Sequence, residues 1–179
     1  MELFAYRMGE QAEAWAEDGE FDGFSLNAYF KATKLSQESE GAGAVAYEFD
    51  DPARVSEFLE MLRGKLAEQM KLLVLAGKKP PFPYESPDFA EAVKHTVWYM
   101  PDVAACHAMR NLLAKKQNRF YHDYKIIVAA GSAAGIGVAA LPPVQEAMDE
   151  PLTTKTITLS CGKLTTGVTV KPWTGILML

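Results

Sequence analysis

Several features common in secreted, membrane and disulfide-linked proteins are missing from this sequence of 179 residues. Its N-terminus has no basic start followed by an apolar stretch, and no segment reaches the roughly 18 uninterrupted apolar residues of a membrane span. The two cysteines, Cys106 and Cys161, lie among apolar or small residues. This usage is typical of free thiols in a reducing compartment. We therefore expect a cytoplasmic protein with no membrane contact.

The motifs of several enzyme classes are also absent. His95, His107 and His122 lack the spacing of metal ligands, so the sequence indicates no metal site. It contains no Gly-x-x-x-x-Gly-Lys-[Ser/Thr] phosphate loop and no Gly-x-Ser-x-Gly nucleophile elbow. The chain therefore cannot build a Walker A phosphate cradle of its own, and nothing in it arranges a catalytic serine.

Charge is distributed unevenly along the chain, whose formal net charge is −5. Residues 1–60 contain four Lys and Arg against fourteen Asp and Glu, whereas residues 61–179 contain fourteen against nine. A polyanion would therefore meet the second part of the chain. A solvated surface explains this balance about as well. Hydrophobic residues make up 49% of the sequence, enough for the core of one domain.

The first half of the chain predicts an irregular organisation. Residues 1–8 read as a short strand, residues 9–77 as an acidic helical insertion or subdomain, and residues 78–87 as a proline-rich connector. Within the insertion we expect one short helix in the segment 25–35, capped by Ser25, and a strand over 44–49. A longer helix should begin at Asp51-Pro52, a capping residue followed by proline, and end at Gly77.

The second half, residues 88–179, alternates regularly between strand and helix patterns. We expect helices to about Lys94, over 102–116 and over 142–148, and strands over 95–100, 124–130, 156–160 and 176–179. Such an alternation predicts βαβ units and an α/β fold with a mostly parallel sheet. Helices should cover both of its faces.

The run Ile126–Gly137 is a strand followed by Gly-x-x-x-Gly-x-Gly, which resembles the cofactor loop of short-chain dehydrogenases. That family needs a Tyr-x-x-x-Lys pair well downstream, where the lysine lowers the pKa of the tyrosine. Tyr121 and Lys125 have this spacing but lie upstream. We therefore interpret the run as a loop of small residues.

The most informative segment is Lys155–Trp173. A β-rich run enters a turn that contains Gly162, Lys163, Thr165, Thr166 and Gly167. Glycine lets the backbone approach a ligand closely, and threonine hydroxyls and free N–H groups supply donors. Open α/β sheets bind ligands at the carboxyl ends of their strands. The sequence therefore predicts a phosphate-contact loop here.

Three segments together resemble a known series of motifs. His95–Leu113 resembles motif IV of superfamily 2 helicases, Tyr124–Gly131 resembles the next strand with its glycine, and Thr156–Trp173 resembles motif V. The similarity is greatest to the ATP-dependent motor subunits of restriction-modification enzymes. It implies a three-layer RecA-like domain, the second of two such lobes, and Met1–Met8 is similar to the first strand of that lobe.

The resemblance implies roles for particular residues. The contacts to the DNA backbone would come from Pro101, Asp102, Lys163, Thr165 and Thr166, and those to the nucleotide from Gly167 and Thr169. Asp102 fits a helix cap better than a ligand. Thr169 occupies the aspartate position of the family's Gly-x-Asp element, which weakens a charged contact to the ribose.

The resemblance also implies what such a motor needs beyond this chain. ATP and Mg²⁺ would bind the full-length protein, and we expect no cofactor and no ATP hydrolysis in the isolated chain, because lobe one and motif VI are missing. Its partners would be double-stranded DNA, the first RecA-like lobe of the same polypeptide, and a methyltransferase or specificity subunit. Two alternatives are a small self-contained nucleotide- or phosphate-binding protein and a noncatalytic interaction domain that uses acidic residues 1–60.

Overall fold

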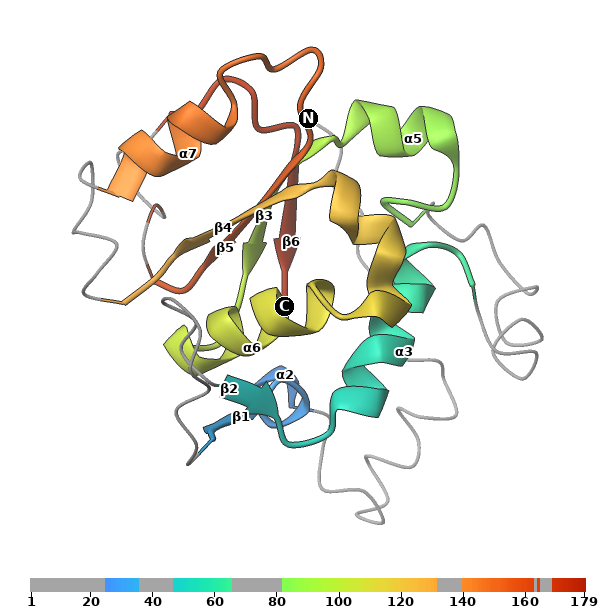
Figure 1. Cartoon of the computed structure of the whole chain (residues 1–179), viewed down its shortest axis with the longest axis vertical. Helices are drawn as coiled ribbons and strands as arrows, with labels where there is room; N and C mark the ends of the chain where they lie inside the picture. Colours follow the sequence, from blue (N-terminus) through green and yellow to red (C-terminus); the bar gives the residue numbers. More distant parts are fainter. Residues whose placement is uncertain (1–24, 36–46, 66–81, 132–139, 163, 165–168) are drawn as a thin grey trace.

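The computed structural model describes residues 25–35, 47–65, 82–131, 140–162, 164 and 169–179. Its centre is a four-stranded sheet in the order β4-β5-β3-β6 (Figure 1). The strands are β3 (His95–Tyr99), β4 (Lys125–Ala129), β5 (Thr156–Ser160) and β6 (Gly175–Met178). Each strand pairs in parallel with its neighbours. The predicted parallel pairing of these segments is confirmed.

The burial of strand β5 shows that both faces of the sheet are covered. All of its residues are buried. Ile157 and Leu159 belong to the core on one face, and Thr158 lies on the opposite face because side chains alternate along a strand. A parallel strand with both faces covered is the usual centre of an α/β domain.

The first face is covered by helix α6 (Val103–Leu113). Cys106, Met109, Leu112 and Leu113 are buried, as the helical spacing predicts. The helix ends at Leu113, earlier than the predicted 116, and a 3-10 helix, η1 (Lys116–Asp123), follows. The Asn118 side-chain amide donates to the Leu112 carbonyl over 2.7 Å and so takes an acceptor that a further helical turn would use.

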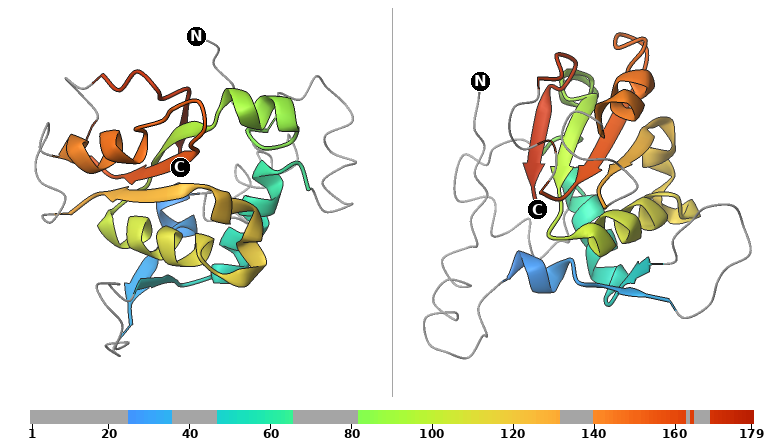
Figure 2. Two further views of the ribbon diagram at one scale, coloured as in Figure 1. Left: turned by 45° about the horizontal axis from the view of Figure 1, so that its top comes forward. Right: turned by 90° about the vertical axis from the view of Figure 1, so that its left-hand side faces the viewer.

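An antiparallel ribbon of β1 (Ala32–Lys34) and β2 (Tyr47–Phe49) lies on the side of α6 away from the sheet (Figures 1 and 2). Helix α2 (Leu26–Tyr29) precedes it, and the Ser25 side chain caps this helix as predicted. The short helix predicted within residues 25–35 is confirmed, whereas β1 in the second half of that segment was not predicted. Pairing with β2, a distant segment, decides that structure.

Helix α3 (Pro52–Leu62) begins as predicted, with Asp51 as its cap and Pro52 in the first turn. The predicted end at Gly77 is wrong, because the helix ends at Leu62. Gly64 has φ +73°, and the Lys65 amide donates back to the Glu60 carbonyl over 3.0 Å. Left-handed glycine commonly ends helices in this way.

Two short helices complete the described fold. Helix α5 (Pro87–Ala92) is capped by Ser86, and the residues before it, Phe82 and Tyr84, are buried in the core. Helix α7 (Leu141–Ala147) lies on the second face of the sheet, where Val144 packs with Leu164 and Val170. Helices thus flank the sheet on both faces, which confirms the predicted α/β class and is consistent with a three-layer RecA-like domain.

The predicted domain boundaries at residues 8, 77 and 87 remain predictions. The strand expected over 1–8 and much of the acidic insertion lie outside the described residues. In the part described, Val55 and Leu59 of α3 share one core with Trp98 of the sheet.

Candidate phosphate-contact site

The ends of β3, β4 and β5 lie at one edge of the sheet, the carboxyl edge. The Met100 amide donates to the Ser160 carbonyl over 2.8 Å, which joins the end of β3 to the end of β5. The Ser160 hydroxyl donates to the Ala129 carbonyl over 3.2 Å, which joins β5 to β4. The loops that follow the three strands therefore start side by side.

The turn after β3 contains Pro101 and Asp102, both proposed from the sequence as DNA contacts. Pro101 is half-buried and Asp102 is exposed. The Asp102 carboxylate accepts a hydrogen bond of 2.7 Å from the Ala105 amide, so it caps α6 as the sequence predicts. This cap leaves the Val103 and Ala104 amides in the first turn, where helices present N–H groups to anions.

The end of β4 approaches the same helix. Gly131 has φ +76°, and a Cβ atom placed there would lie 3.2 Å from Cγ1 of Val103. Glycine is therefore needed for both the backbone angle and the space. The sequence drew attention to Gly131 through a dehydrogenase-like pattern, and the structure shows that it lets the end of β4 lie against the start of α6.

The loop after β5 starts with two left-handed residues, Gly162 at φ +63° and Leu164 at φ +60°. Leu164 is buried, and its carbonyl accepts a hydrogen bond of 3.0 Å from the Tyr99 hydroxyl. Leucine rarely has a positive φ, and no pattern in the sequence indicates this one. Burial raises the pKa of Tyr99 above its ordinary value, so its hydroxyl stays protonated and able to donate near neutral pH.

The other loop residues singled out from the sequence are placed as follows. Thr169 is exposed and precedes the buried Val170. The remaining predicted contact residues lie outside the described residues: Lys163, Thr165, Thr166 and Gly167. Their roles, and those of Pro101, Asp102 and Thr169, remain predictions.

Both cysteines lie near this edge as free thiols. The thiol of Cys106, in the first turns of α6, hydrogen-bonds with that of Cys161, which directly follows β5. Burial, and then the neighbouring Cys161, raise the pKa of Cys106 far above its ordinary value. Because a thiolate is the reactive form, Cys106 is unsuited to act as a nucleophile.

His107 and His95 make packing and hydrogen-bond contacts within the described part of the chain. His107 stacks on Tyr47 with ring centroids 5.7 Å apart, and burial lowers its pKa. His95 is buried between the Thr156 hydroxyl and the Pro151 carbonyl, at 3.0 and 2.8 Å. No group of three or more metal-ligating side chains occurs among these residues.

Comparison with known proteins gives one informative relative. The chain is 36% identical over 91 residues to a protein of Mycoplasma pneumoniae named as a candidate type II restriction enzyme and methyltransferase, C-terminal part. The match covers 48% of this chain but only 12% of that protein's length. It supports a relation to restriction-modification proteins.

The other comparisons found nothing. No family model matches the chain, and no solved structure matches it.

Among the helices that the structure describes, none is long and apolar enough to cross a membrane.

Proposed function

We propose that this chain is the second RecA-like lobe of an ATP-driven DNA motor in a restriction-modification system. The observation that carries the proposal is the carboxyl edge of the parallel sheet. The loops after β3, β4 and β5 begin together there, and the sequence after β5 continues into the Lys163–Gly167 segment. The similarity to a restriction-modification protein supports the restriction-modification part of this proposal.

In this proposal the chain contributes positioning and charge stabilisation. The first-turn amides of α6 and the hydroxyls of Thr165 and Thr166 would donate hydrogen bonds to DNA phosphates, and Lys163 would add a positive charge. Gly167 and Thr169 would face the nucleotide. Such contacts fit phosphoryl-transfer motors, in which most of the catalysis is orientation and electrostatics.

The remaining parts would come from elsewhere in the full-length protein. The Walker A lysine and the acidic Mg²⁺ ligands would belong to a first RecA-like lobe that holds ATP against this one. Duplex DNA would be the substrate track, and a methyltransferase or specificity subunit a further partner. The relative's name, which joins a restriction enzyme to a methyltransferase, supports that last assignment.

The decisive experiment is Thr166→Val in the full-length enzyme. Loss of one hydroxyl donor costs on the order of 1 kcal/mol, and more when the acceptor is a charged phosphate. We expect an unchanged melting temperature and a loss of DNA-stimulated ATP hydrolysis. The control is Thr154→Val, which removes a hydroxyl bonded to the Glu150 carbonyl at the other edge of the sheet.

Two outcomes would contradict the proposal. A Thr166→Val enzyme that melts early while its folded fraction stays fully active would show that the hydroxyl is structural. DNA-stimulated ATP hydrolysis by the purified 179-residue chain would show that it is complete without a first lobe. Weak duplex binding by the isolated chain is expected, and it should fall steeply with salt because phosphate contacts release counterions.

A further inference from the structure

A second region of the molecule carries uncompensated positive charge. Between Arg110 and Lys125 the sequence has five Lys and Arg and one acid, Asp123. This stretch runs from the end of α6 through η1 into β4. It lies near the amino ends of the strands, opposite the carboxyl edge, because η1 leads into the start of β4.

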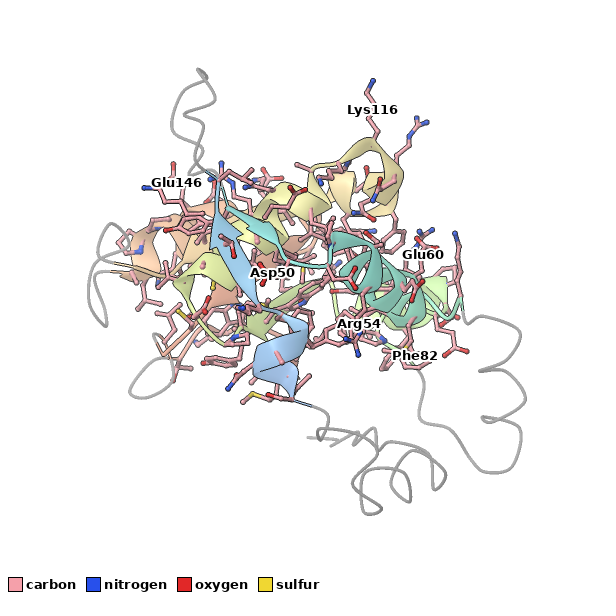
Figure 3. All side chains as sticks on the ribbon, turned by 90° about the horizontal axis from the view of Figure 1, so that it is seen from below. Asp50, Arg54, Glu60, Phe82, Lys116 and Glu146 are labelled. Atoms are coloured by element: carbon pink, nitrogen blue, oxygen red, sulfur yellow. The ribbon has the colours of Figure 1, made fainter. Side chains whose placement is uncertain are left out.

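The cations Lys116, Arg119 and Lys125 are all exposed. Segment η1 is kinked at Asn118, whose φ and ψ are −96° and 33°, and its buried residues are Asn118 and Tyr121. Lys116 and Arg119 lie on either side of this kink, and Lys125 lies at the start of β4. Figure 3 shows Lys116 projecting away from the body of the protein.

These three cations are not neutralised by neighbouring acids. Within the described residues, Lys116, Arg119 and Lys125 have no carboxylate close enough for an ion pair, whereas other cations do: Lys31, Arg63, Lys65, Lys94 and Lys115. Although Asp123 lies in the same stretch and Lys115 pairs with Glu48, cations outnumber acids there, and such an excess keeps a positive potential that attracts polyanions.

The backbone beneath these charges is held firmly. The Asn118 amide donates to the Leu112 carbonyl over 2.7 Å, and the Tyr121 hydroxyl donates to the Leu59 carbonyl over 2.9 Å. Both bonds are buried and tie η1 to α6 and α3. A surface held in place before binding loses less conformational freedom when a ligand binds.

We propose that Lys116, Arg119 and Lys125, the η1 basic face, form a second contact surface for the phosphate backbone of duplex DNA. The identity of the polyanion rests on the proposed function. Lys125 lies at the start of the five-residue strand β4, so about 13 Å of strand separates its Cα atom from that of Ala129 at the carboxyl edge, at roughly 3.3 Å per residue. The face adds sequence-independent affinity, since lysine and arginine contacts to phosphates do not read bases.

The test measures duplex DNA binding by the 179-residue chain as a function of salt concentration. The variant Lys116→Gln/Arg119→Gln should bind roughly tenfold more weakly at low salt. Its slope of log affinity against log salt should fall by about 1.8, at about 0.9 per phosphate contact. Lys125→Gln, which lies on β4 rather than on η1, should lower the slope by about 0.9.

The matched control is Lys31→Gln/Lys34→Gln on and beside β1, which changes the net charge equally. Lys31 forms only an exposed pair with Asp50, and such pairs contribute little to stability. Control binding should remain near that of the wild type. Equal binding by the η1 variant and the control would overturn the inference.

A third variant, Lys163→Gln/Thr166→Val, separates this inference from the proposed function. Loss of affinity in the η1 variant with none in this third variant would support the η1 basic face and contradict the phosphate-contact loop. The reverse result would leave the proposed function standing and remove the second surface. Failure of the wild-type chain to bind duplex DNA at low salt would overturn both.

Discussion

The Tyr99 hydroxyl donates a hydrogen bond of 3.0 Å to the backbone carbonyl of Leu164, and this bond ties the end of β3 to the loop that follows β5. Leu164 has φ +60° and a buried side chain. A left-handed leucine is unfavourable by itself, so the hydrogen bond and the burial together hold Leu164 in this conformation. The start of the candidate phosphate-contact loop is therefore fixed by tertiary contacts.

Replacing Tyr99 by phenylalanine should destabilise the protein and alter that loop. The loss of one neutral hydrogen bond lowers the free energy of unfolding by about 1 kcal/mol, which urea denaturation measures. Tyr47→Phe is the control, because the Tyr47 hydroxyl makes no hydrogen bond within the described residues and its ring stacks on His107. Equal stability of the two variants would show that the Tyr99 hydroxyl does not hold Leu164.

Alanine at Gly131 should cost more stability than alanine at Gly162. Both glycines have positive φ, which costs an L-residue roughly 1–2 kcal/mol. At Gly131 the new methyl group also meets Val103 at 3.2 Å, whereas at Gly162 no described atom lies within 4 Å. Thermal unfolding of the two variants measures the difference, and Val103→Ala combined with Gly131→Ala should recover part of it. If the double variant recovers no stability, the contact between the new methyl group and Val103 is relieved by a small shift of neighbouring atoms.

Asp102 should prove to be a helix cap. Asp102→Ala should lower the free energy of unfolding by about 1 kcal/mol, because the Ala105 amide loses its acceptor, while Asp102→Asn should preserve stability. The asparagine variant should also bind duplex DNA at least as well as the wild type, because a carboxylate repels phosphate. Weaker DNA binding by a stable Asp102→Asn protein would instead support a direct role for the carboxylate.

Loss of the side-chain hydroxyl should change the stability of the protein differently at two neighbouring tyrosines. The Tyr121 hydroxyl donates to the Leu59 carbonyl over 2.9 Å, so Tyr121→Phe should destabilise the protein by about 1–3 kcal/mol through an unpaired carbonyl and a lost bond. The buried Tyr124 hydroxyl has no hydrogen-bond partner among the described residues. Tyr124→Phe should therefore be neutral or stabilising in urea denaturation at pH 7, and destabilisation would reveal a partner for that hydroxyl.

Alkaline pH should destabilise the wild-type protein through the same cluster. Burial raises the pKa of Tyr124 from 10.0 to about 12 and raises those of Tyr84 and Tyr121 further. Above pH 10 the unfolded chain loses these protons while the folded protein keeps them, so the free energy of unfolding falls as pH rises. Tyr124→Phe should flatten this decline between pH 10 and 12, and an unchanged profile would contradict the assigned burial.

The local starts of helices were predictable from the sequence because they depend on neighbours within one turn. Ser25, Asp51, Ser86 and Asp102 all cap helices with their side chains, and each residue type favours that position. The parallel strands were also predictable, because apolar runs alternate with helical patterns after Pro87. Their order in the sheet, with β5 between β3 and β4, arises only when distant segments pair.

The errors and omissions have a common cause. Strand β1 is short, with Thr33 and Lys34 both exposed, and it exists because β2, across residues 36–46, offers it partners. Helix α3 ends at Leu62 because of Gly64. Apolar residues continue at helical spacing beyond Gly64, and this pattern predicted a longer helix. The positive φ of Leu164 and the contact between the two cysteine thiols have no local signal at all.

By itself, the sequence therefore determined the α/β class, the helix caps and a glycine- and threonine-rich loop after a buried strand, since each depends on residues close together in the chain. Tertiary structure decided which loops meet at the carboxyl edge. The structure also shows that the Asp102 carboxylate caps α6. It also decided that Lys116 and Arg119 of η1 are exposed. Asn118 and Tyr121 of the same segment are buried instead, because they bond to partners in α6 and α3.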